Sequence, residues 1–182
     1  MYCVTNRALA GEGFLEQIER TAKSGVDGII LREKDLSEAE YEELALKVQK
    51  ICRAAGVPLI LHTYVNVARR LGIRSIHLPL GKALAMGETE KKDFDVLGVS
   101  THSVEEAEAA WKAGADYVTA GHVFATDCKK GLPPRGLDFL RAVCASVPIP
   151  VYAIGGITPE NASACVEAGA AGVCLMSYFM KK

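Results

Sequence analysis

The stretch VYAIGGITPENASACVEAGAAGVCLMS (residues 151–177) contains one complete strand–helix–strand repeat. Two short apolar runs, Val151–Ile154 and Gly172–Met176, flank a segment with helical spacing. Pro159 stands near the first turn of that segment and Gly169 at its end, where helices favour these two residues. Runs that are apolar throughout are typical of strands covered on both faces, so the stretch predicts a unit of parallel sheet.

The same alternation extends along the whole chain and predicts eight strands. These are Tyr2–Thr5, Gly28–Arg32, Leu59–His62, Ser75–Leu78, Val96–Ser100, Tyr117–Val123, Val151–Ile154 and Gly172–Met176. Amphipathic segments separate them, and one of these begins with a capping box at Ser37 and Glu40 and ends at Gly56.

Eight repeats in 182 residues predict one α/β domain over residues 1–182, a compact TIM (β/α)8 barrel. A doubly wound open sheet is the alternative. The segment 81–95 contains Gly87 and predicts a reduced fourth helix. Little chain follows the eighth strand, so we expect the last helix to be truncated.

Composition restricts the class of function. The chain carries 21 Lys and Arg against 22 Asp and Glu, which does not favour nucleic acid or an anionic membrane as a partner. No apolar run approaches the roughly 20 residues of a membrane helix. Six scattered cysteines without a C-x-x-C pair are typical of reduced thiols, so we expect a cytoplasmic protein.

The predicted strand ends are rich in cations and hydrogen-bond donors, which indicates an anion site where TIM barrels hold their functional groups. Arg32 and Lys34 lie two residues apart at the second strand end, so both are expected to point to one side and to pair with a carboxylate or phosphate. We expect Glu33 and Asp35 to be solvated charges. Ser100 ends the fifth strand and is a further candidate for substrate binding.

Gly155 and Gly156 follow the seventh strand, while Met176 and Ser177 follow the core of the eighth. Loops at these two strand ends commonly cradle a phosphate through backbone amides. Paired glycines let such amides approach a ligand closely, although they also suit a plain tight turn. We predict that Gly155, Gly156 and Ser177 bind the phosphate of a small-molecule substrate, and that Met176, at the end of the eighth strand, also contacts the substrate.

The stretch AGHVFATDCKKGLPPRG (residues 120–136) places His122 at the sixth strand end, with Thr126 and Lys129 close behind. A lone strand histidine is more often a packed residue than a catalyst. An imidazole at a barrel rim can, however, accept and return a proton near neutrality. His62 and His77 also lie at strand ends and compete for this role.

Two further kinds of chemistry receive less support. The Cys128 thiol is a candidate nucleophile, but the sequence offers it no dedicated base. Carboxylates are scarce at the predicted strand ends, which argues against a hydrolytic pair of acids and against a multi-carboxylate metal site. We therefore predict no bound metal.

The segments LREKDLS, LGVSTHS, GADYVTAGHVFATDCKKGLPPRG, PVYAIGGITPEN and AGVCLMS resemble the superfamily of thiamine phosphate synthases and thiazole tautomerases. The resemblance runs from the second to the eighth strand and implies a phosphate-binding (β/α)8 barrel. The synthases carry an Asn-Asp pair after strand three and an acid in an HLGQ-x-D loop, which serve magnesium and the diphosphate of a pyrimidine substrate. Here these positions read His62–Thr63 and HLPLGK, and Ile30 replaces a Gln that contacts the pyrimidine.

Because those acids are absent, the resemblance implies an isomerase, a thiazole tautomerase that needs no cofactor. His122 would move the proton of a carboxythiazole phosphate, and Arg32, Lys34 or Lys129 would hold its carboxylate. Two other interpretations stay open: a transferase like thiamine phosphate synthase, and a non-catalytic protein that binds thiazole or thiamine phosphate. The prediction also allows for a homodimer.

Overall fold

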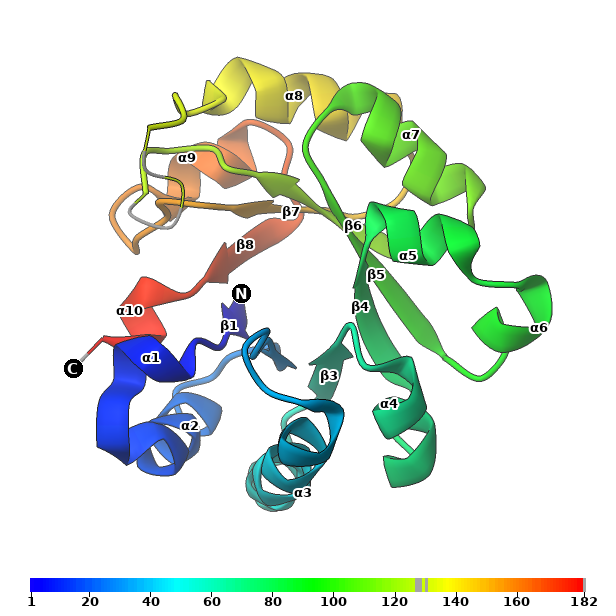
Figure 1. Cartoon of the computed structure of the whole chain (residues 1–182). Helices are drawn as coiled ribbons and strands as arrows, with labels where there is room; N and C mark the ends of the chain where they lie inside the picture. Colours follow the sequence, from blue (N-terminus) through cyan, green and yellow to red (C-terminus); the bar gives the residue numbers. More distant parts are fainter. Residues whose placement is uncertain (127–128, 130, 182) are drawn as a thin grey trace.

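Eight parallel strands close into a barrel in chain order, and β8 pairs back to β1. The computed structural model describes residues 1–126, 129 and 131–181 (Figure 1). The strands are β1 Tyr2–Val4, β2 Gly28–Leu31, β3 Leu59–His62, β4 Ser75–Pro79, β5 Val96–Thr101, β6 Tyr117–Gly121, β7 Val151–Ile154 and β8 Gly172–Leu175. The predicted barrel is confirmed, and the open-sheet alternative is wrong.

Helices surround the strands, as Figure 1 shows. They are α1 Arg7–Ala10, the 3-10 turn η1 Gly11–Gly13, α2 Phe14–Ala22, α3 Glu38–Ala55, α4 Val65–Leu71, α5 Leu80–Ala85, α6 Glu88–Lys91, α7 Val104–Lys112, α8 Gly136–Ser146, α9 Ala162–Glu167 and α10 Ser177–Met180. The fourth unit is reduced to the short helices α5 and α6, and α10 is a single turn, as expected. No helix in the described part of the chain has both the length and the apolar character needed to cross a membrane.

The longest helix, α3, begins as its sequence predicts. The Ser37 side chain accepts a hydrogen bond from the Glu40 backbone N–H, and the Glu40 carboxylate accepts one from the Ser37 backbone at 2.9 Å. The helix ends at Gly56, whose φ of 69° suits a residue without a Cβ. Both helix ends are therefore determined by local chemistry.

Two apolar cores hold the barrel together, because successive strand residues point to opposite faces of the sheet. Between sheet and helices lies a large core that contains fully buried residues such as Ile18, Leu61 and Leu140. Inside the barrel lies a smaller cluster that consists of Val4, Ile30, Ile60 and Cys174.

Three tyrosine rings fill the barrel at the amino-terminal ends of its strands. Tyr2 stacks on Tyr117 at 6.1 Å between ring centroids and meets the edge of Tyr152 at 4.9 Å. Glycines on neighbouring strands make room for these rings, since a Cβ on Gly98 would lie 2.1 Å from the Tyr117 ring and one on Gly28 would lie 2.7 Å from Tyr2. The rings occupy this end of the barrel interior, so the functional space lies at the other end.

We expect Gly98→Ala to lower the free energy of unfolding by about 1–3 kcal/mol, because the added methyl group overlaps a fixed ring. Gly81→Ala is the matched control: nothing lies within 4 Å of a Cβ there, and the residue is helical. Urea unfolding measures both variants. A Gly98→Ala protein as stable as the Gly81→Ala protein would contradict the close packing of Gly98 against the Tyr117 ring.

Candidate active site

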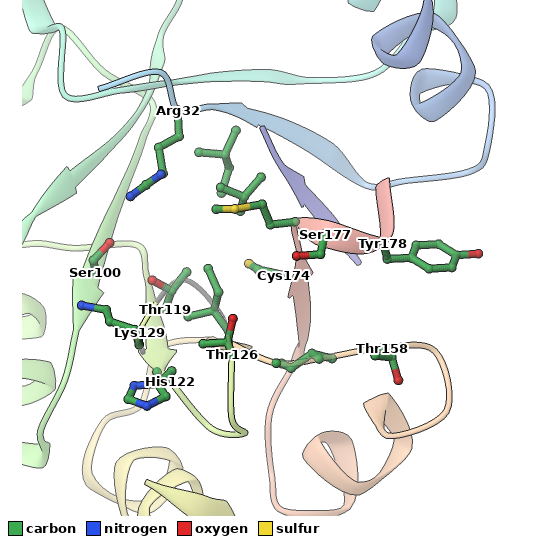
Figure 2. A pocket seen from close by; sticks show the side chains of 18 of the residues that line it. Arg32, Ser100, Thr119, His122, Thr126, Lys129, Thr158, Cys174, Ser177 and Tyr178 are labelled. Carbon is green, nitrogen blue, oxygen red and sulfur yellow. The ribbon is translucent and has the colours of Figure 1, made fainter. Parts of the chain in front are cut away.

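A cavity of about 870 Å³ opens at the carboxyl ends of the strands. Every residue that the sequence placed in the site lines it: Arg32, Lys34, Ser100, His122, Thr126, Lys129, Gly155, Gly156, Met176 and Ser177 (Figure 2). The volume lies in the range of small-molecule sites. The structure thus brings these residues together, and their individual roles stay predictions.

One side of the cavity is a cation wall, formed by Arg32, Lys34 and Lys129. In Figure 2 the side chains of Arg32 and Lys129 reach toward Ser100 from two sides. Partial burial and the positive charges of Arg32 and Lys129 lower the pKa of Lys34, so the three charges act on one another. Within the described residues none of them forms an ion pair. No carboxylate of the described residues pairs with the wall, so its positive charge can act on a ligand.

Glu33 is not the solvated charge that we expected, since it is only 4% exposed. Its carboxylate accepts hydrogen bonds from the Thr5 hydroxyl at 2.6 Å and from the Arg7 backbone N–H at 2.9 Å. The Thr5 oxygen in turn accepts the Arg32 backbone N–H at 2.9 Å. Burial raises the pKa of Glu33. This carboxylate ties the β1–α1 connection to the end of β2 and so positions Arg32, whereas Asp35 is exposed, as expected.

Two buried histidines stack inside the barrel beside the cation wall. The rings of His62 and His77 lie 5.8 Å apart, and His77 bridges the Ser100 hydroxyl (2.8 Å from Nε2) and the Tyr117 hydroxyl (2.9 Å from Nδ1). The Thr63 hydroxyl lies 2.7 Å from His62 Nδ1. Burial lowers the pKa of each imidazole to about 3. Both rings are therefore neutral near pH 7, where they serve as hydrogen-bonding groups and not as cations.

His122 lies at the edge of the cavity. Its side chain is buried, and Nε2 lies 3.4 Å from the Leu132 carbonyl oxygen in the connection between β6 and α8. Figure 2 shows the ring on the side of the pocket away from Arg32. The contact with Leu132 turns this nitrogen toward the loop.

Close packing is one physical reason for the paired glycines after β7, whereas their expected contact with a phosphate stays a prediction. A Cβ on Gly155 would lie 2.3 Å from the His122 Cβ, and one on Gly156 would lie 2.3 Å from the Ala125 carbonyl oxygen. Their φ angles are +99° and +66°, which side chains disfavour. The missing side chains thus make room for the segment that follows β6, although both glycines also line the cavity.

Sequence reasoning missed several lining residues. Thr119 and Cys174 lie two residues before Gly121 and Met176, so the alternation of a strand could have found them. Tyr178 follows Ser177 on α10 and carried no motif. Cys128, the candidate nucleophile, lies outside the described residues.

The donor set of the cavity does not fit magnesium, which prefers carboxylate oxygens and water. No group of three or more His, Cys, Asp and Glu side chains in the described ranges could hold a metal ion. Glu160 is the one carboxylate among the described lining residues.

Comparison with known proteins decides the family. A family model described as thiamine monophosphate synthase matches residues 1–179. The chain is 35% identical over 181 residues to a putative thiamine-phosphate synthase 2 of Aquifex aeolicus, and the match covers 100% of this chain and 97% of that one. It belongs to the thiamine monophosphate synthase family. A thiamine-phosphate synthase of Syntrophomonas wolfei is 36% identical, with 99% and 88% covered. A solved thiamine phosphate pyrophosphorylase from Pyrococcus furiosus superposes on this family member with a TM-score of 0.83 at 32% identity, over 97% of this chain and 84% of that one.

The prediction of an isomerase is therefore wrong. Relatives at 35–38% identity over most of their length are named thiamine-phosphate synthases, which are transferases. The absence of two acids therefore does not mark this chain as an isomerase.

Acidification is expected to destabilise the protein through the two buried histidines. The unfolded chain binds protons at His62 and His77 below about pH 6.5, but the folded chain does so only near pH 3. Each histidine should therefore contribute about 2 kcal/mol to the stability lost between pH 8 and pH 5. Urea unfolding of His62→Gln should show about 2 kcal/mol less loss than wild type over this interval. Equal losses would contradict the neutral, buried state of His62.

Replacing Glu33 with Gln should lower the free energy of unfolding by about 1–3 kcal/mol, because an amide NH₂ group would then face the donors of Thr5 and Arg7. Asp35→Asn is the matched control and should cost less than about 1 kcal/mol, since its pair with Arg7 is exposed. Urea unfolding at pH 7.5 separates the two. Similar losses of stability in both variants would contradict the conclusion that Glu33 holds the β1–α1 connection against the end of β2.

Proposed function

We propose that this chain is a transferase that joins a thiazole phosphate to a pyrimidine diphosphate and forms thiamine phosphate. The observation that carries the proposal is that one cavity is lined both by three cations and by the glycine and serine residues after β7 and β8. The names of the relatives supply the reaction class. The small substrates of this reaction and the free cysteines of the chain agree with the cytoplasmic location that we expect.

The two regions suit two different anions. Gly155, Gly156 and Ser177 offer backbone amides and a hydroxyl to the phosphate of the thiazole. The cation wall faces the diphosphate, for which Arg and Lys are the usual partners. Between the two regions, Ile30 and Cys174 form part of an apolar inner surface that suits flat heterocycles.

The reaction needs one bond formed and one bond broken. The thiazole nitrogen attacks the methylene carbon of the pyrimidine substrate, so a C–N bond forms while the C–O bond to the diphosphate breaks. The diphosphate leaves with the electron pair of that bond, and the new thiazolium ring carries the positive charge. Positive groups near the leaving oxygen stabilise the charge that develops there.

The Ser100 hydroxyl, which His77 orients, can donate a hydrogen bond to the anionic substrate. The Ser100 hydroxyl lines the cavity beside the cation wall, and His77 contacts it from inside the barrel at 2.8 Å. When the imidazole Nε2–H donates to the serine oxygen, the serine proton is free to point at an anionic ligand. No proton needs to leave the substrates in this reaction, so His122 is not required as a base.

Formation of thiamine phosphate with one equivalent of inorganic diphosphate from the two substrates tests the proposal. Arg32→Gln should lower kcat/KM by about 100-fold, because charge stabilisation at the leaving group is lost. Arg141→Gln is the matched control, since Arg141 is exposed on α8 and pairs with Asp138. No product from folded wild-type protein, or equal activity in both variants, would reject the proposal.

A second candidate is a non-catalytic protein that binds thiazole phosphate or thiamine phosphate. The observation that favours it is the poor fit of the described donor set to magnesium. Calorimetric binding of either phosphate without any product in the assay above would support this candidate.

A further inference from the structure

Two positions beside the cation wall lack the acids that the resemblance to thiamine phosphate synthases leads one to expect. The Asn-Asp pair after β3 is replaced by His62–Thr63, and HLPLGK (residues 77–82) ends in Lys82 where the pattern HLGQ-x-D has its acid. Lys82 lies in α5, directly after β4. One acid has thus become a hydroxyl residue and the other a cation.

Lys82 acts on the same region as the cation wall. The charges of Arg32, Lys34 and Lys82 all act on the buried His62, which adds to the effect of burial on its pKa. Lys82 is not among the residues that line the cavity, but it lies in α5, directly after β4, the strand that pairs with β3. Its charge has the sign that a bound divalent cation would supply.

These four cations differ from three arginines at the surface of the molecule that have carboxylate partners. Arg69, Arg70 and Arg74 each pair with carboxylates at the surface. Across the described ranges, no ion pair involves Lys82 or a member of the cation wall. Like charges that lack counter-ions repel one another, and a multiply charged anion relieves that repulsion.

We propose that the cation wall binds a diphosphate-class anion directly and without a bridging divalent metal ion, and that Lys82 adds positive charge from α5. The inference deepens the proposed function and rests on it for the identity of the anion. Carboxylates beside a diphosphate repel it unless a metal ion lies between them. Here Thr63, the neutral imidazoles and Lys82 remove that repulsion, and lysine and arginine contact the anion themselves.

Calorimetric titration with inorganic diphosphate tests the inference without turnover. We expect binding in the presence of a chelator that is no weaker than binding with added Mg²⁺. Arg32→Gln and Lys129→Gln should each weaken metal-free binding by about tenfold or more, and Lys82→Gln by a few-fold, because charge-assisted contacts are lost. Lys112→Gln is the control, since Lys112 is exposed at the far end of α7 and outside the cavity lining.

The double variant Thr63→Asp with Lys82→Asp restores the acids and should reverse the metal dependence. We expect metal-free diphosphate binding to fall about 100-fold or more and to recover when Mg²⁺ is added, since the new carboxylates need a counter-ion. Asp suits position 63, where φ is +76° and Thr is strained. Urea unfolding confirms that the double variant is folded. Lys112→Asp combined with Lys50→Gln makes the same change in net charge at exposed positions outside the cavity lining and is the control.

Three outcomes overturn the inference: wild-type protein that binds diphosphate only with Mg²⁺, wild-type protein that does not bind it at all, and cation variants that bind like the control. Product formation without metal-free binding would leave the proposed function standing and reject this inference. Metal-free binding without product formation would reject the proposed function and keep the anion site.

Discussion

Hydrogen bonding between β1 and β8 closes the sheet, and the inward side chains of eight strands then share one narrow space. Three tyrosine rings occupy its amino-terminal end, where glycines on neighbouring strands leave them room. Above them lies the small apolar cluster around Ile30 and Cys174, and above that the open cavity. The position of the site at the carboxyl ends of the strands follows from this order of layers.

Charged side chains on the outer surface and at the cavity mouth differ in their partners. On the outside, arginines such as Arg70 and Arg74 meet carboxylates in exposed pairs, which contribute little to stability. At the mouth of the cavity the cations face a space for a ligand. The one deeply buried carboxylate nearby, Glu33, accepts hydrogen bonds from Thr5 and Arg7 on the outer side and holds the backbone of Arg32 in place. The backbone of Arg32 at the mouth is thus positioned through a buried carboxylate.

Membership of the thiamine monophosphate synthase family and the absence of the expected acids are compatible if the anion is held in another way. A diphosphate can be neutralised in two ways: by a metal ion that carboxylates hold, or by lysines that contact the anion directly. A barrel rim can carry either set of groups, because its loops vary while the strands hold them. The chain has the second set of groups. The contrast also explains why the missing acids were a poor guide to the reaction: they bear on how an anion is held and not on which bond is made.

The sequence by itself determined the eight strands, the capped helix α3, the reduced fourth unit and ten of the residues that line the cavity. Apolar periodicity and capping chemistry are local, and in a βα barrel every strand end reaches the same rim. Only the tertiary structure decided that Glu33 is buried, that His77 links Ser100 to Tyr117, and that Gly155 and Gly156 make room for the segment after β6. Glu33 and Thr5 are 28 positions apart and His77 and Ser100 are 23 apart, so their contacts depend on strand register, which no local pattern contains.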